Sequence, residues 1–307
     1  MPTHPRHNLL AHILLIGVVL VWGCTFPLVK SALNDISPLL FNLLRMSLAA
    51  LVLLTLNHRV LRGLTRSELR LCITAGLFLA LGYSFQTTGL AHTTPSKSAF
   101  LTGLVVVIVP ILSLIPRVAP PTSPRPNAIV FLGAILAFIG LILLTSTPGT
   151  GAALLSGMHL GEWLTLLCAI AFAAHLLTLA HAAPQLSARR LGTLQIAFAA
   201  VFMLFALPLG GRPHLHLPPT AILALAITAL LATAAAFTIQ SWAQQLLPPT
   251  HTALILTLEP VFAALTSLLF FHERFGPREI LGAALILAGI LLAELRSGQP
   301  IAPEAIA

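Results

Sequence analysis

The chain has 307 residues, of which 57% are hydrophobic and only 8% are charged. A soluble globular domain carries roughly 25% charged residues, so this chain has too few charges to build a water-exposed surface. Its net charge of +8 does not indicate a nucleic-acid partner, because Lys and Arg lie in short connections between apolar runs and not on one basic face. Composition therefore predicts an integral membrane protein whose surroundings are the lipid bilayer.

Ten apolar runs follow one another along the chain, each close to the roughly 20 residues that a helix needs to cross a bilayer core. The runs cover residues 9–29, 38–56, 69–90, 96–116, 127–146, 160–181, 191–209, 219–241, 250–271 and 278–295. The bilayer core offers no water to the backbone, so each run must satisfy its own amides and is predicted to be helical. The first run is too long for the apolar part of a signal peptide and is expected to be a retained helix. The predicted fold class is an all-α integral membrane protein with ten transmembrane helices.

Two connections carry residues that are typical of helix starts. Thr65 and Glu68 have the spacing of a capping box, which predicts that a helix begins between them. Pro277 follows Gly276 and suits the first turn of the last helix, where a missing N–H leaves no bond unmade.

The distribution of Lys and Arg predicts that both termini are cytoplasmic, because positive charge accumulates on that side of a membrane protein. In this orientation ten of these residues lie in cytoplasmic connections: Arg6, Arg59, Arg62, Arg66, Arg70, Arg117, Arg125, Arg189, Arg190 and Arg296. Five lie in outer connections: Lys30, Lys97, Arg212, Arg274 and Arg278. The remaining one, Arg45, lies inside a predicted helix.

Landmark residues of the first half recur in the same order in the second half, at offsets between 154 and 149 residues. The pairs are Gln86 with Gln240, Pro110 with Pro260, Gly133 with Gly282, and Gly140 with Gly289. This pattern predicts two five-helix repeats, over residues 9–147 and 160–296. Because five is odd, the second repeat must enter the membrane inverted, and inverted repeats of transporters hold the substrate near the midplane where the halves meet.

Several motifs resemble those of the EamA family in the drug/metabolite transporter superfamily. They are Trp22–Pro27 in the first run, Ser98–Gly103 leading to Pro110, Leu258–Ala264, and His272–Phe275 followed by Gly282 and Gly289. The resemblance extends over about residues 12–295. It implies a ten-helix bundle with a central cavity that moves metabolites across the cell membrane, with members often acting as exporters of amino acids or related solutes.

Arg45 is the most conspicuous candidate for solute binding. An arginine at the centre of a membrane helix costs roughly 2.5–3.5 kcal/mol, so it should face the bundle interior or a wet cavity. Its planar guanidinium matches a carboxylate or phosphate of a solute. The alternatives are that it extends to the membrane surface or pairs with a backbone carbonyl.

Five further polar or aromatic residues within the runs are candidates for solute contacts: Trp22, Asn42, Tyr83, Gln86 and Gln240. The two glutamines are related by the repeat, and they either line the cavity or hold helices together through interhelical hydrogen bonds. Trp22 either lines the cavity or belongs to the aromatic belt at the membrane interface.

Glu259, which directly precedes Pro260, is the candidate for ion coupling. Proline removes a backbone donor and loosens the helix there, and a carboxylate beside such a break can bind a cation or a proton. The alternative is a purely structural glutamate that pairs with Arg45 or with helix ends.

The sequence lacks the residue patterns that metal binding, ATP binding and catalysis require. The three cysteines fall singly inside apolar runs, and neither they nor the histidines have metal-ligand spacing. A phosphate-binding Gly-Lys-Ser/Thr loop is missing, so ATP is not expected as a partner. Asp35 is the only aspartate, and the glutamates are scattered. We therefore expect no metal, no cofactor and no catalytic residue.

The sequence as a whole predicts a secondary transporter in the inner (cytoplasmic) membrane. Its partner would be a small organic metabolite, such as an amino acid, a related solute or a drug, exported by alternating access. Two alternatives stay open: a carrier of sugar-nucleotide or lipid-linked solutes, and an intramembrane transferase. Both a monomer and a homodimer are compatible with the sequence.

Overall fold

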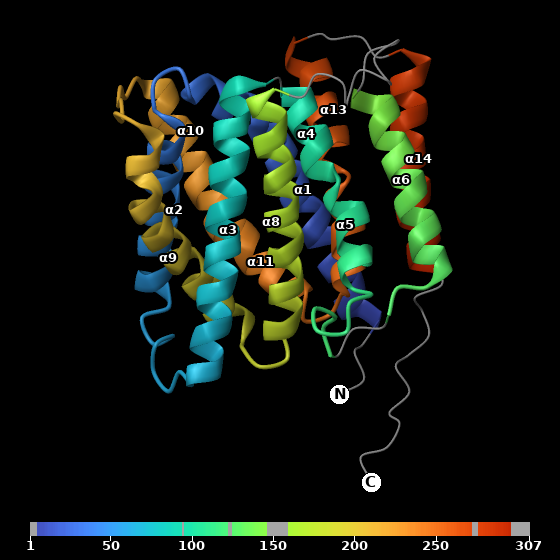
Figure 1. The fold of residues 1–307 in the computed structure, drawn as a ribbon, viewed down its shortest axis with the longest axis horizontal. Helices are drawn as coiled ribbons and strands as arrows, with labels where there is room; N and C mark the ends of the chain where they lie inside the picture. The colour runs from blue at the N-terminus through green and yellow to red at the C-terminus, as the bar shows by residue number, and fades with distance from the viewer. Residues whose placement is uncertain (1–4, 94, 122–124, 146–158, 272–275, 296–307) are drawn as a thin grey trace.

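A computed structural model describes residues 5–93, 95–121, 125–145, 159–271 and 276–295. These residues form a bundle of helices that run roughly side by side along one direction (Figure 1). In the described ranges the only β-type pairing is a single isolated bridge between Ile36 and Leu215. The beginning of α1 (Pro5–Ala32) and the end of α14 (Pro277–Leu295) lie at the same end of the bundle.

The first half of the chain forms six described helices. They are α1, α2 (Pro38–Leu56), α3 (Arg66–His92), α4 (Pro95–Gly103), α5 (Val105–Leu112) and α6 (Ala128–Thr145). The second half forms α8 (Leu160–Ala182), α9 (Ala188–Ala206), the 3₁₀ turn η1 (Leu207–Gly210), α10 (Pro219–Ala229), the π-helical segment η2 (Leu230–Ala235), α11 (Ala236–Ala243), α12 (Pro249–Leu256), α13 (Glu259–Phe271) and α14.

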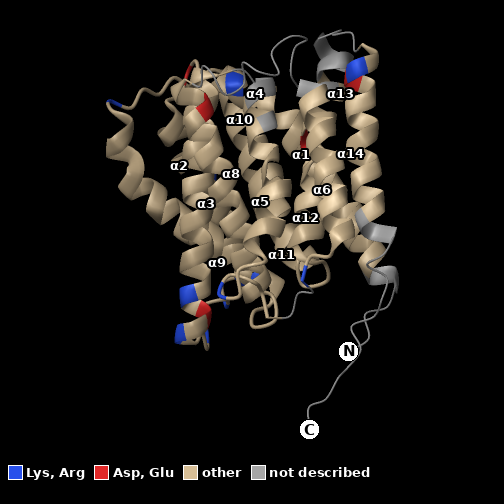
Figure 2. Cartoon of the chain, turned by 45° about the vertical axis from the view of Figure 1, so that its right-hand side comes forward, with Lys and Arg blue, Asp and Glu red and all other residues tan. Residues whose placement is uncertain are grey.

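Six helical stretches are long and apolar enough to cross a membrane. They are Asn8–Ala32, Pro38–Leu56, Arg66–His92, Leu160–Ala182, Ala188–Gly210 and Pro219–Ala243, with shorter apolar helices at Leu101–Leu112 and Ala128–Leu143. Many large apolar side chains on these helices are exposed, as a lipid-facing surface requires. Charged residues gather at the two ends of the bundle (Figure 2). The chain is therefore a multi-pass membrane protein.

Two of the ten predicted runs are not continuous helices. Run 96–116 divides into α4 and α5 at Leu104, and run 250–271 divides into α12 and α13 at Thr257 and Leu258. At the second break the amides of Thr257 and Leu258 bond three residues back, to Leu254 and Ile255. Pro260 has no N–H to offer the carbonyl four residues earlier, so the regular ladder stops there.

Helix starts follow the expected local chemistry. Thr65 caps α3 by accepting the amide of Glu68 at 3.2 Å, and the Glu68 carboxylate accepts the amide of Thr65 at 2.8 Å. The capping box is thus confirmed. Pro277 is the first residue of α14. The motif His272–Phe275 lies outside the described residues.

α6 and α14 pack side by side at one edge of the bundle (Figure 1), at a distance that only glycine permits. A Cβ added to Gly140 would lie 2.5 Å from the carbonyl oxygen of Gly282. A Cβ added to Gly289 would lie 2.5 Å from the carbonyl oxygen of Gly133. The four glycines that recur between the halves therefore meet one another at a single helix contact.

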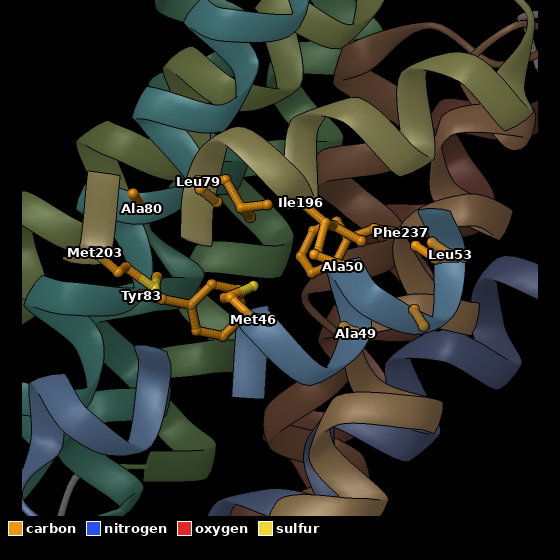
Figure 3. Close-up of a cluster of buried hydrophobic side chains, with 12 residues drawn as sticks. Met46, Ala49, Ala50, Leu53, Leu79, Ala80, Tyr83, Ile196, Met203 and Phe237 are labelled. Atoms are coloured by element: carbon orange, nitrogen blue, oxygen red, sulfur yellow. The ribbon is translucent and has the colours of Figure 1, made fainter. Parts of the chain in front are cut away.

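A buried cluster joins α2, α3, α9 and α11 (Figure 3). Met46 and Ala49 from α2 pack with Leu79 of α3, Ile196 of α9 and Phe237 of α11. Tyr83 belongs to the same cluster, and the side chains of Trp22 and Phe172 pack against it. This packing fixes the wall from which the polar groups of the candidate site project.

Candidate functional site

A cavity of about 860 Å³, counted with the space through which it opens, lies between the helices. Its walls come from α1, α2, α3, α4, α5, α8, α11, α12 and α13. Six residues singled out in the sequence line it together: Trp22, Arg45, Tyr83, Gln86, Gln240 and Glu259.

Arg45 points into the bundle and is only 4% exposed. Its Nε donates to the Thr233 hydroxyl at 2.6 Å, and its Nη2 donates to the Tyr83 hydroxyl and the Ala232 carbonyl, both at 3.1 Å. The guanidinium also lies over the Tyr83 ring, 4.4 Å from its centroid. Pairing with a backbone carbonyl is therefore realised, while Nη1 has no hydrogen-bond partner among the described residues.

The π-helical segment η2 supplies the acceptors for Arg45. Its wider turn lets the Thr233 hydroxyl donate to the carbonyl of Thr228, five residues earlier, at 2.8 Å. The Ala232 carbonyl accepts both Arg45 and the indole N–H of Trp22, the latter at 2.8 Å. α1, α2 and η2 are thus joined at one carbonyl, that of Ala232.

Asn42 does not line the cavity. Its amide nitrogen donates to the Tyr83 carbonyl at 2.9 Å, and its amide oxygen accepts the Thr87 hydroxyl at 3.1 Å. Both polar atoms therefore fasten α2 to α3, which corrects the expectation that Asn42 contacts the solute.

The two repeat-related glutamines face the cavity from α3 and α11. Gln86 Nε2 lies 3.4 Å from the Thr102 hydroxyl, a long hydrogen bond. Gln240 is only 2% exposed, and its Oε1 has no hydrogen-bond partner within the described part of the chain. A buried amide oxygen without a donor is costly unless a ligand or water supplies one.

Glu259 is the first residue of α13, directly after the break between α12 and α13. A carboxylate at a helix N-terminus is favoured by the helix dipole. Arg45 lines the same cavity, but no ion pair of 4 Å or less joins the two side chains in the described ranges. The structural alternative of an Arg45–Glu259 salt bridge is therefore not realised.

Both broken helices reach the cavity at their breaks. Thr102, Gly103 and Val105 line it around the end of α4, and Thr257 and Glu259 line it around the start of α13. Backbone that departs from regular helix inside a membrane protein is tolerated where it borders a cavity.

The sequence reading missed Phe172, Phe237 and His175, which line the cavity with Trp22 and Tyr83. The Phe237 ring lies 5.4 Å from Trp22 and 6.0 Å from Tyr83, and the Phe172 ring lies 5.3 Å from Tyr83. A phenylalanine within an apolar run carries no signal of which helix face it occupies. The sequence spacing of the histidines bears on metal binding and gives no signal that His175 lines a cavity.

The fold and its cavity define a multi-pass helical membrane protein with a cavity between its helices. The model of the EamA-like transporter family matches the chain twice, over residues 9–146 and 159–295. This chain belongs to that family, within the drug/metabolite transporter superfamily.

Two curated relatives are similar over most of their length. An uncharacterized transporter of Archaeoglobus fulgidus is 33% identical over 283 residues, which covers 91% of this chain and 84% of that protein. The uncharacterized transporter YoaV of Bacillus subtilis is 24% identical over 290 residues, covering 91% and 94% respectively. A solved structure titled only as the crystal structure of a protein superposes with a TM-score of 0.72 at 16% identity, covering 94% of this chain and 99% of that one. The last likeness concerns the fold alone.

Proposed function

We propose that this protein is a secondary transporter that exports small organic solutes, such as amino acids, related metabolites or amphipathic drugs, across the cytoplasmic membrane by alternating access. The observation that carries the proposal is the internal cavity, which joins a buried arginine and a glutamate to aromatic walls. Membership of a transporter family supports it.

The ten crossings would be two inverted repeats, over residues 9–147 and 160–296. The break at Leu104 in the first half and the break at Leu258 in the second half are 154 residues apart, the offset that separates Gln86 from Gln240. Matched breaks that face one cavity are what inverted-repeat transporters use to bind substrate between their halves.

In this proposal Arg45 Nη1 binds an anionic group of the solute, since the other nitrogens of the guanidinium are occupied by the protein. Trp22 and Tyr83 form an apolar wall for the rest of the solute, and Gln86 and Gln240 offer amides to it. Glu259 couples transport to an ion, because a carboxylate at the end of a broken helix can exchange a proton or cation when the cavity changes sides.

Orientation with both termini in the cytoplasm follows from the ten-to-five distribution of Lys and Arg between the two sides. The protein would act as a monomer or homodimer, with the solute and the bilayer as its partners.

A sugar-nucleotide carrier is less favoured than an amino acid carrier. Phosphate groups call for several basic side chains, and Arg45 is the only Lys or Arg among the residues found to line the cavity. An intramembrane transferase is disfavoured by the family, and we assign no catalytic residue.

The test is counterflow in liposomes that contain the purified protein. A panel of labelled amino acids is followed with and without an imposed pH gradient, next to liposomes without protein. Saturable exchange of one solute class is the expected result. Exchange no faster than in the protein-free liposomes, for amino acids, other metabolites and amphipathic cations alike, would remove the proposal.

A further inference from the structure

His175 lies in the cavity wall as part of a hydrogen-bond chain that leads away from the cavity. It is 1% exposed, and its Nε2 lies 2.7 Å from the Gln195 amide oxygen. Gln195 Nε2 donates to the Ser241 hydroxyl at 2.9 Å, and that hydroxyl donates to the Phe237 carbonyl at 2.7 Å. The chain runs from α8 through α9 to α11.

The donor-to-acceptor direction of these hydrogen bonds determines which ring nitrogen of His175 carries the proton. Ser241 has one hydroxyl proton, which goes to the Phe237 carbonyl, so its oxygen must accept from Gln195. Gln195 therefore turns its oxygen to His175, and an oxygen can only accept. Nε2 of His175 must carry the proton, and Nδ1 of the neutral ring is left as an acceptor.

Nδ1 of His175 has no hydrogen-bond partner among the described residues. Gln240 lines the same cavity, and its buried Oε1 is also without one in the described ranges. His175 and Gln240 both line the cavity, from α8 and α11. His175 packs edge-on against Phe237, with 5.8 Å between ring centroids, and Gln240 follows Phe237 by one helical turn. One turn further on, Gln244 donates at 3.0 Å to the carbonyl of Leu176, the residue after His175.

We infer that His175 Nδ1 and Gln240 Oε1 form an acceptor pair that binds the ammonium group of the transported solute. The pair offers two acceptor atoms and no donor, which an ammonium with three N–H groups satisfies and a carboxylate does not. Glu259 adds a carboxyl group to the same cavity, while Arg45 supplies a positive charge from α2. The transporter would thus select amines, with or without a carboxylate, over the corresponding acids. This inference rests on the proposed transport function.

Binding and transport are measured separately to test it. Calorimetry on the detergent-purified full chain uses three probes with one aromatic group in common: phenethylamine, L-phenylalanine and 3-phenylpropionate. The phenyl group suits the aromatic wall of the cavity. We expect the two amines to bind and the acid, which has no N–H, to bind at least about tenfold more weakly.

Three variants distinguish a loss of the acceptor atoms from a loss of the folded structure. His175→Gln keeps a donor at the position of Nε2 for Gln195 but has no acceptor at the position of Nδ1. His175→Asn keeps an acceptor near Nδ1 and gives up the link to Gln195. Gln240→Leu removes an acceptor whose oxygen bonds to nothing in the described protein. We expect His175→Gln and Gln240→Leu each to weaken amine binding at least about tenfold, and His175→Asn to weaken it less.

Equal binding of the acid and the amines overturns the inference, as does unchanged amine affinity in folded His175→Gln and Gln240→Leu. Lack of amine binding at about 1 mM, the upper end of common substrate affinities, also overturns it. Counterflow in liposomes then tests the transport function independently of the binding measurements. If solutes are exchanged without a preference for amines, the protein is a transporter but the acceptor pair is wrong. If amines bind and the variants weaken that binding, but no counterflow occurs, the acceptor pair is right and the transport function is wrong.

Discussion

Arg45 holds three protein groups, and in the proposed mechanism it also binds the solute. Its Nε and Nη2 donate to Thr233, Tyr83 and Ala232, and the proposal assigns Nη1 to the solute. A lysine has a single ammonium and cannot span this set.

We predict that Arg45→Lys lowers solute counterflow by about tenfold or more while the protein stays monodisperse in detergent, because charge-assisted hydrogen bonds contribute about 1.5–3 kcal/mol each. Arg59→Lys, at an exposed position outside the cavity, is the matched control. Wild-type counterflow in Arg45→Lys would show that charge alone suffices.

Glu259→Gln tests ion coupling. Glutamine keeps the size and hydrogen-bonding capacity of the side chain but cannot exchange a proton at physiological pH. We predict that solute exchange without a gradient persists, while the stimulation by a pH gradient disappears. Glu68→Gln, at the capping box and the Arg190 ion pair, should keep that stimulation. If Glu259→Gln still responds to the gradient like the wild type, the carboxylate is not the coupling group.

Which side chains face the cavity was only partly predictable. A polar group inside an apolar run must have a hydrogen-bond partner or contact water. This is why the sequence draws attention to Arg45, Gln86, Gln240 and Glu259. Asn42 stands out equally, yet its amide nitrogen and its amide oxygen both bond to α3. His175 needed the geometry of Gln195 and Ser241, which lie on other helices.

At the level of helices, the glycine contact between α6 and α14 gives the sharpest test of packing. An alanine at residue 140 would place its Cβ 2.5 Å from the backbone oxygen of Gly282, and backbone moves less readily than a side chain. We predict that Gly140→Ala lowers the melting temperature in detergent, since overpacking costs about 1–3 kcal/mol.

Gly17→Ala is the control for this prediction. No heavy atom lies within 4 Å of a Cβ added to Gly17, and alanine favours the helix over glycine by roughly 1 kcal/mol. Its melting temperature should equal or exceed that of the wild type. Equal melting temperatures for Gly140→Ala and the wild type would mean that the two helices separate at little cost.

Helix starts were predictable and helix interruptions were not. The capping box at Thr65 is a purely local pattern of hydrogen bonds, so it can be recognised without the rest of the fold. The π-helical segment Leu230–Ala235 contains neither Gly nor Pro. Its wide turn is held by Trp22 and Arg45, which bond to the Ala232 carbonyl from two other helices.

The whole bundle makes a prediction about sidedness. Cysteines introduced at Arg59 and Arg212, both exposed and in the connections after α2 and α9, should lie on opposite faces of the membrane. We predict that Arg212→Cys reacts with an impermeant maleimide on intact cells, whereas Arg59→Cys reacts only after the membrane is opened. The parent protein, with its two buried cysteines and Cys24 on an apolar helix, measures the background. The reverse pattern would place both termini outside.

The sequence by itself determined that this is a multi-pass helical membrane protein of the EamA type. Its apolar runs have the length of the bilayer core, and its family motifs are continuous stretches of chain. Both properties can be read from composition and from continuous stretches of sequence. The rotation of each helix about its axis cannot, because a nearly uniform apolar run has no preferred face. Only the packing of α2, α3, α8 and α11 against one another brought Arg45, His175 and Gln240 to one cavity, where their remaining lone pairs and N–H groups can meet a solute.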